Sequence, residues 1–281
     1  MPLFDRTAEL LVAAPGQAGV FVRGLRIEFE VKKSNRGEPN TALIKVTNMS
    51  PTSRNALGTT GTVATLQAGY NEDPQSVRII SEMDVMDVQT MRNRPDVTTI
   101  VYCRDGANAL RNNKGSHSYS GGTDAKKIIR DVAADAGLTL RSLGEVANDI
   151  YSNGFSETGP ISDIFDKLAG KIGARWSMQN GEVQFAPLDG PSSLTVVVLN
   201  QKSGLIGQPQ RRNKIGAPEN PAQKDGWVVR SLLQPQIEPE SLVRIESEEV
   251  DSTFRVVAVT HRGDTRGQDF FSEIEVQEYA R

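Results

Sequence analysis

Apolar and charged residues alternate along the first third of the chain, with the two-residue period of half-buried strands. In residues 25–32 every odd position is apolar and every even position is charged. Further runs of strand character follow at residues 41–48, 61–70, 77–89 and 97–104. Five strands at this spacing predict a small barrel or sandwich.

Two local features interrupt this pattern. Ser50 and Pro51 are suited to the N-cap and the first position of a short helical turn. In the long run 77–89 the alternation places four apolar residues on one face: Val77, Ile79, Met83 and Val85. The phase changes near Met86 and Val88, which predicts a bulge or a bend in this strand.

The middle third changes to a helical period. A first helix, with Thr123 as its N-cap and Gly137 as its C-cap, has a single apolar stripe: Ala125, Ile128, Ile129, Val132, Ala133 and Ala136. A second helix begins at Pro160, stops at Gly173 and uses Ile161, Ile164, Phe165, Leu168 and Ile172. We expect the helix–Gly–strand modules to pack together, because each of them is too small to fold alone.

Asn180-Gly181 is the strongest short-range hairpin signal in the chain. It joins residues 174–179 to residues 182–187, and the alternation puts four large side chains on one face: Trp176, Met178, Val183 and Phe185. The two helices and this hairpin therefore predict one compact α+β insert.

The last third returns to strands. Residues 194–199 are almost all apolar and predict a buried strand. Residues 204–225 are rich in Gly, Pro, Asn and Gln, and predict a long loop that becomes ordered on assembly. Four more strands are expected at residues 227–233, 242–247, 254–261 and 270–279.

Composition and net charge argue against several classes of function. The chain has 281 residues and a net charge of −3, which argues against a dedicated nucleic-acid binder. A single cysteine excludes an intramolecular disulfide, and two histidines argue against a histidine-based metal cage. We expect no membrane-spanning helix, because no apolar run approaches 18 residues. We expect no secretory signal, because the first ten residues carry acidic residues and lack a long apolar core. We also expect no cofactor.

Charge is distributed unevenly. Residues 236–281 hold eleven acidic and five basic residues, a net charge of −6, so the rest of the chain carries +3. Such asymmetry is typical of a protein whose surfaces face different partners.

Candidate catalytic chemistry is sparse. His261 and Asp264 are suited to an acid–base or metal pair, but a turn at Gly263 between two strands is favoured, because no third ligand is near in sequence. Cys103 lies in a strand, which favours a buried structural thiol. A loose acidic group could serve a glycosidase, but a solvated loop is favoured: Glu145, Asp149 and Glu157.

Two features of the sequence are candidates for anion binding. Gly121-Gly122 precedes the first helix and could present backbone amides, although a flexible joint is favoured. Arg211, Arg212 and Lys214 could contact phosphate, could simply lie in a solvated loop or could contact an acidic protein neighbour, and the sequence leaves these alternatives open.

The order of these segments resembles the baseplate hub proteins of contractile-tailed bacteriophages and related phage-tail-like particles. The resemblance covers nearly the whole chain and rests on residues 25–31, 39–42, 46–50, 67–70, 159–165, 173–176, 203–209, 226–233, 254–256 and 261–264. The chain departs from the family pattern at Gln234-Pro235 and Pro239-Glu240, where other turn residues are usual.

The resemblance implies two tail-tube-like antiparallel β-barrel domains and a small helix and hairpin region. We expect the first barrel at residues 1–108, the α+β insert at 109–190 and the second barrel at 191–281. The chain would be a structural, non-enzymatic virion protein of the tail baseplate, assembled in the bacterial host cytoplasm. Three copies would form a homotrimer, a ring of six barrels.

The implied partners are the tail spike protein, the tail tube protein, other baseplate proteins and the tape-measure protein, with DNA only in transit through the ring. Phosphate would bind a strongly positive channel wall, so we expect acidic side chains to face the lumen. The candidates are Glu246, Glu248 and Glu249. Two alternatives stay open, a particle-borne cell-wall hydrolase and a cell-wall-binding module.

Overall fold

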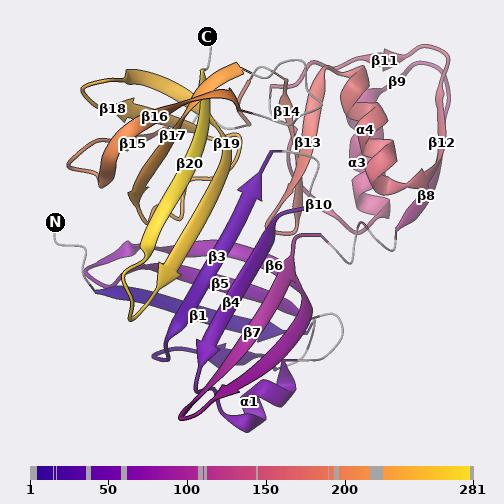
Figure 1. Ribbon diagram of the computed structural model, residues 1–281. Helices are drawn as coiled ribbons and strands as arrows, with labels where there is room; N and C mark the ends of the chain where they lie inside the picture. Colours follow the sequence, from indigo (N-terminus) through magenta and orange to yellow (C-terminus); the bar gives the residue numbers. More distant parts are fainter. Residues whose placement is uncertain are drawn as a thin grey trace.

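Strands dominate the computed structural model shown in Figure 1. It describes residues 5–278 except 15, 17, 36–38, 58–61, 107–109, 111–112, 144, 189, 193–195 and 216–223. The predicted fold class, mainly β with an α+β insert, is confirmed. No helix in the described ranges has the length and apolar character needed to cross a membrane.

The first β unit lies at the bottom of Figure 1. Its elements are β1 (Arg6–Ala13), β2 (Val20–Val22), β3 (Ile27–Ser34), β4 (Thr41–Thr47), α1 (Pro51–Ala56), β5 (Val63–Tyr70), β6 (Asp73–Asn93) and β7 (Asp96–Arg104). The predicted alternation is confirmed in β3, where Ile27, Phe29 and Val31 are all buried. Ser50 caps α1 by accepting a hydrogen bond from the Ser53 amide, as predicted.

Strand β6 contains two irregularities, of which the sequence predicted one. The register against β7 shifts between Val85 and Asp87, which confirms the bulge at Met86. The register against β5 also shifts at Ile80, so Ile80 is buried and Ile79 is exposed. The prediction that Ile79 shares the inner face with Met83 is therefore wrong, because an extra residue reverses the alternation between them.

The α+β insert stands at the upper right of Figure 1. It consists of β8 (Lys114–Tyr119), β9 (Thr123–Asp124), α3 (Ala125–Asp135), β10 (Thr139–Ser142), β11 (Ile150–Tyr151), β12 (Phe155–Pro160), α4 (Ile161–Lys171), β13 (Ala174–Gln179) and β14 (Glu182–Pro187). The predicted hairpin is exact, and Asn180 and Gly181 both have positive φ. The N-cap of α3 is Asp124, one residue after the predicted Thr123.

The second β unit lies at the upper left of Figure 1. Its strands are β15 (Val196–Leu199), β16 (Leu205–Ile215), β17 (Lys224–Leu232), β18 (Leu242–Glu246), β19 (Asp251–Asp264) and β20 (Phe270–Glu278). The four strands predicted in this region are present.

Two predictions for this unit are wrong. The predicted loop at residues 204–225 is an antiparallel pair in its described part, because β16 pairs with β17 despite two register shifts. Residues 216–223 lie outside the described residues. The described part of the strand predicted as buried at 194–199 is buried on one face only, since Leu199 is buried but Val196 and Val198 on the opposite face are exposed.

A single sheet path connects the two β units. Its order is β16-β17-β20-β19-β3-β4-β7-β6-β5-β1-β2, and β18 and β15 branch from β19. The first part of β19 pairs with β18, and residues 258–264 pair with β3. Among the described strands this path is open at both ends.

The buried apolar residues form three clusters. One contains residues of the first β unit together with Leu233 and Phe270, a second lies within the insert, and a third lies within the second β unit. The domain boundaries after residues 108 and 190 stay a prediction.

Candidate functional site: the junction of the three units

The junction begins at the seam where β3 pairs with β19. Phe29 lies opposite Gly263 in the register, and an added Cβ at Gly263 would lie 2.2 Å from Phe29 Cζ. The seam therefore requires glycine at this position. The prediction of a turn at Gly263 is wrong, because residues 261–264 continue β19 and the chain turns only after Asp264.

Aromatic side chains from both β units pack beneath this seam. The Phe270 ring makes edge contacts with Phe29 and Tyr70, at centroid distances of 6.1 and 5.3 Å. The Tyr70 hydroxyl accepts a hydrogen bond of 3.1 Å from the Leu233 amide. The first unit's core thus extends into the second unit, which fixes the angle between them.

His261 is fully buried in the seam, and its Nδ1 lies 2.9 Å from Ser272 Oγ. Burial, reinforced by the nearby Lys33 charge, lowers the pKa of His261 to about 3. The ring is neutral at pH 7. His261 and Asp264 do not form the acid–base pair considered from sequence, because Asp264 pairs instead with Arg26 at 2.6 Å.

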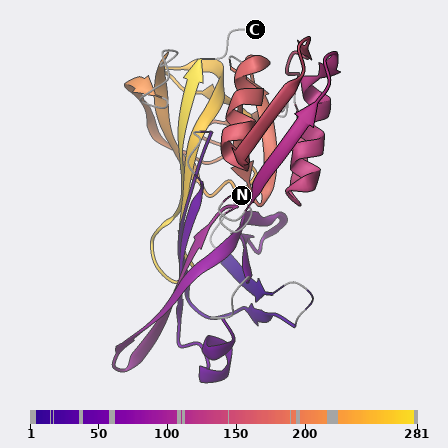
Figure 2. The same ribbon diagram turned by 90° about the vertical axis from the view of Figure 1, so that its right-hand side faces the viewer.

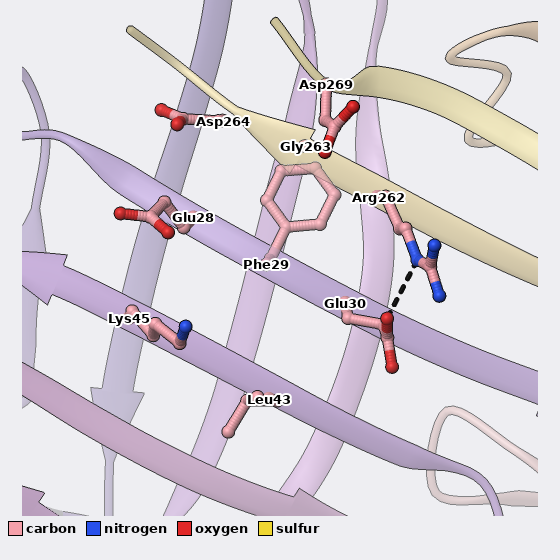
Figure 3. A pocket seen from close by; sticks show the side chains of 9 residues that line it. All are labelled: Glu28, Phe29, Glu30, Leu43, Lys45, Arg262, Gly263, Asp264 and Asp269. Atoms are coloured by element: carbon pink, nitrogen blue, oxygen red, sulfur yellow. Dashed lines mark hydrogen bonds and ion pairs between the residues drawn. The ribbon is translucent and has the colours of Figure 1, made fainter. Parts of the chain in front are cut away.

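The outer face of the seam has a hollow of about 370 Å³ (Figure 3). Charged side chains of β3, β4 and β19 surround it, with acidic residues in excess. Glu30 Oε2 accepts a hydrogen bond of 2.7 Å from Arg262 Nε, which is the dashed line in Figure 3. Lys32 Nζ lies 2.6 Å from the same carboxylate. These contacts lower the pKa of Glu30.

The insert is attached to the first β unit through its hairpin turn. The buried carboxylate of Asp105 accepts hydrogen bonds from the backbone amides of Asn180 and Gly181, at 2.8 and 2.7 Å. Asn40 Nδ2 donates to Asp105, to the Met178 carbonyl and to Gln179 Oε1. Burial raises the pKa of Asp105 despite these donors.

Lys33 connects all three units at the centre of the junction. Its side chain is fully buried, and its Nζ donates to Asn180 Oδ1 at 2.8 Å and to Glu238 Oε1 at 3.3 Å. Glu238 also pairs with Arg141 of the insert at 2.6 Å. Burial acts to raise the pKa of Glu238, but the charges of Lys33 and Arg141 outweigh it and the pKa is lowered.

A second buried carboxylate joins the insert to the second β unit. Glu240 accepts two hydrogen bonds from Arg175, of 2.7 and 3.0 Å, and one from Asn35. Arg255 Nη1 lies 3.8 Å away. Burial outweighs these contacts and raises the pKa of Glu240. Breaking such a buried pair is costly, so the junction holds the three units in one arrangement.

The sequence patterns did not predict the four buried charged residues of the junction: Lys33, Asp105, Glu238 and Glu240. One signal was present, since Lys33 occupies an inward position of β3 after Ile27, Phe29 and Val31. A lysine in that phase predicts a buried acidic partner, although its identity depends on the fold.

The other candidate catalytic residues are separated. Cys103 is buried, as predicted, and burial raises the pKa of its thiol to about 12. Asp149 pairs with Lys171 and Glu157 pairs with Lys167, while Glu145 is exposed, so no carboxylate pair forms. The described residues contain no group of three potential metal ligands.

The side chain of Lys214 lies outside the described residues, and the other remaining candidates lie at the surface. Arg211 pairs with Asp225, and Arg212 pairs with Glu275 at 2.8 Å. Gly121 closely approaches the Ser152 carbonyl in the joint before α3. Glu246 accepts hydrogen bonds from Asn200 and Arg244, which lower its pKa, and Glu248 and Glu249 are exposed in the turn before β19.

Two strands of the continuous sheet have an open edge among the described strands. β16 pairs only with β17, and β6 beyond Val85 pairs only with β7 among the described strands. This part of β6 and β7 forms an arm that projects from the body at the lower left of Figure 2. Open edges of this kind are available for pairing with another chain.

No protein-family model and no curated protein matches the chain. Among solved structures, the chain is similar to a 43 kDa tail protein of prophage MuSo2 from Shewanella oneidensis. The TM-score is 0.65 at 11% identity, over 96% of this chain and 97% of that chain. A tail protein from Neisseria meningitidis MC58 gives a TM-score of 0.64 at 9% identity, over 96% of both chains.

A third similar structure is the E. coli c3393 protein, described as a component of the type VI secretion system with structural similarity to the T4 bacteriophage tail proteins gp27 and gp5. The TM-score is 0.64 at 9% identity, over 96% of this chain and 77% of that chain. The resemblance to tail proteins inferred from sequence motifs is thus confirmed at the level of the fold.

Proposed function

We propose that this chain is a structural hub subunit in the baseplate of a contractile phage tail or a related particle. The observation that carries the proposal is the end-to-end match to two tail proteins, which spans 96% of this chain and at least 96% of each of them. A junction that locks two β units and an insert is suited to a part that bears mechanical load.

The open edges support a ring. β16 ends the sheet path, and the β6 arm has one open edge on an interior strand, so pairing of β16 of one copy with the β6 arm of the next is heterologous. A heterologous contact closes into a ring when its rotation permits. Three copies would present six β units, and the ring would join the threefold spike below to the sixfold tail tube above.

The ring would surround a channel for the tape-measure protein and then for DNA. The wall of such a channel must hold no unpaired positive charge, because phosphate would bind to it. We keep Glu246, Glu248 and Glu249 as lumen candidates. A map of the assembled ring that places all three on the outer wall would refute this assignment.

The similarity of the fold to tail proteins supports a non-enzymatic role. Zymography on peptidoglycan tests this role, and a clear lysis band would establish the hydrolase alternative. Retention on purified cell wall, at the level of a known binder, would favour the binding-module alternative.

The decisive experiment is the native mass of the purified protein, alone and with its spike protein. We expect a trimer in the presence of the spike. A matched variant, Met86→Lys with Met91→Lys, adds charge beside the open edge of the arm and should prevent the ring while the monomer stays folded. A spike complex that contains a single copy of this chain would overturn the proposal.

A further inference from the structure

The insert is a separate body within the fold (Figure 1). Its apolar cluster is drawn only from residues 110–185. The two β units, in contrast, share one sheet path, and Leu233 and Phe270 of the second unit lie in the core of the first. At the junction the insert is attached by the hydrogen bonds and ion pairs of buried charged residues, among them Asp105 and Glu240. Domains attached by polar contacts move relative to one another more readily than domains that share a core, so the insert is the unit able to change its position.

The exit segment, by which the chain leaves the insert, is held by two arginine side chains. It comprises the described residues 187, 188 and 190–192. Arg175 of β13 donates to the carbonyls of Pro187 and Gly190, at 2.9 and 3.2 Å. It also donates to the Leu188 carbonyl. Arg255 of β19 donates to the carbonyls of Leu188 and Gly190, at 2.9 and 3.4 Å. One arginine belongs to the insert and the other to the second β unit, so the backbone of the exit segment connects the two.

Glu240 lies between these two arginines and balances their charge. Its carboxylate accepts hydrogen bonds of 2.7 and 3.0 Å from Arg175 and lies 3.8 Å from Arg255 Nη1. The exposed fraction of the Glu240 side chain is 1%, so this charge depends on the arginines in place of water. The backbone of Glu240 also takes part, because its carbonyl accepts a hydrogen bond of 2.9 Å from the Ser192 amide. A single residue therefore holds the exit segment against both the insert and the second β unit.

Glu240 adopts a left-handed backbone conformation, with a φ of 70°. Among the described residues other than glycine, Asn48 and Asn180 are the only others with a positive φ. Asparagine tolerates this conformation, whereas a glutamate in it stores strain and persists only where the surrounding contacts hold it, as in clamps and switch regions. The other attachment of the insert is the turn Asn180-Gly181 on Asp105. Both turn residues adopt a positive φ readily, so this attachment stores little strain of that kind.

We propose that the exit segment is a latch, which opens when Glu240 releases Arg175 and lets the insert pivot about its hairpin turn. The two β units stay fixed during this motion, because they share a sheet and a core. The latch opens before the hairpin turn does, because opening relieves the backbone strain at Glu240. This conformational device goes beyond the hub role and does not depend on it.

Hydrogen exchange of the whole chain, followed by mass spectrometry, tests the latch. In Glu240→Gln we expect peptides that cover the exit segment to exchange about tenfold faster, the size expected for the loss of one hydrogen bond to a charged group. The amides of Asn180 and Gly181 should keep their wild-type rates, because the pivot stays closed. Glu273→Gln changes an exposed carboxylate of β20 and is the matched control, which should leave exchange unchanged. Equal acceleration in all three units would overturn the proposal, because it would show a general loss of stability.

Distances between spin labels test the pivot. Labels at Arg130→Cys in the insert and Gln268→Cys in the second β unit occupy exposed positions, and the native Cys103 is buried. We expect one distance in the wild-type background and a second, separate population in Glu240→Gln. Faster exchange of the exit segment together with a single unchanged distance would overturn the pivot.

Arg175→Lys is a second variant, which keeps the test valid if Glu240→Gln does not fold. Lysine retains the positive charge but lacks the fork that donates to both carboxylate oxygens, so the same two changes should appear at smaller size. Wild-type exchange and a single distance in the variants that fold by circular dichroism would overturn the latch itself. None of these results bears on the native mass that tests the hub.

Discussion

The fully buried Lys33 Nζ lies 3.3 Å from Glu238 Oε1, although the two residues are 205 positions apart in the sequence. Lys33 belongs to the first β unit and Glu238 to the second, and Asn180 of the insert bonds to both. One buried cation and its partners therefore contact all three units.

Replacement of this cation is expected to loosen the whole junction. Lys33→Met should lower the free energy of unfolding by about 3 kcal/mol, because it leaves Glu238 and Asn180 without their buried donor. Urea denaturation measures the loss. Lys32→Met removes an exposed lysine from the same strand and should cost less than about 0.5 kcal/mol. Equal effects of the two substitutions would contradict the central role of Lys33.

The seam should not tolerate a side chain at Gly263. Gly263→Ala would place a methyl group against the Phe29 ring and should destabilise the protein by about 1–3 kcal/mol. The double variant with Phe29→Leu should recover part of this loss, because the smaller side chain leaves room. Gly159→Ala in β12 has open space around it and serves as the control in thermal unfolding. Additive effects at positions 29 and 263 would argue against the contact.

Acid should weaken the seam through His261. The pKa of His261 is lowered from about 6.5 to about 3 by burial, so the unfolded chain binds a proton more readily than the folded chain. The contribution of His261 is complete above pH 6.5 and is lost progressively as the pH falls toward 3, by about 1.4 kcal/mol per unit.

The measurement compares wild type with His261→Gln by urea denaturation between pH 7 and pH 4.5. Asp105 and Glu240 have raised pKa values and act in the opposite direction, but they are common to both proteins. The difference in unfolding free energy should therefore shrink as the pH falls. A difference that stays constant over this range would show that His261 is not buried in its neutral form.

Cys103 should be unreactive in the native protein. It is buried, and the raised pKa of its thiol leaves almost no thiolate at pH 8. We expect slow labelling by a disulfide reagent under native conditions and complete labelling in urea. The charge of Asp84 also raises the pKa of this thiol, so Asp84→Asn provides a matched variant. Rapid native labelling would show that β7 opens easily.

Local patterns in the sequence determined most elements of this protein. Alternation at residues 25–32 predicted the inner face of β3, and Asn180-Gly181 predicted its hairpin exactly, because each depends only on neighbouring residues. The same reasoning failed at residues 204–225, where β16 is a strand although its sequence lacks periodicity. Pairing with β17 supplies the hydrogen bonds that the local pattern does not indicate.

The tertiary structure alone decided the junction. Lys33 is a charged residue at an inward-facing position of β3, which the alternation of the sequence indicates. Nothing near it in the sequence identifies Glu238, Asn180 or Arg141 as its neighbours. Gly263 suggested a turn until Phe29, from a strand more than 200 residues earlier, was found opposite it. Periodicity reports which face of a strand is buried. Partners across such distances are selected by the burial and hydrogen bonding of the complete fold, which no local pattern contains.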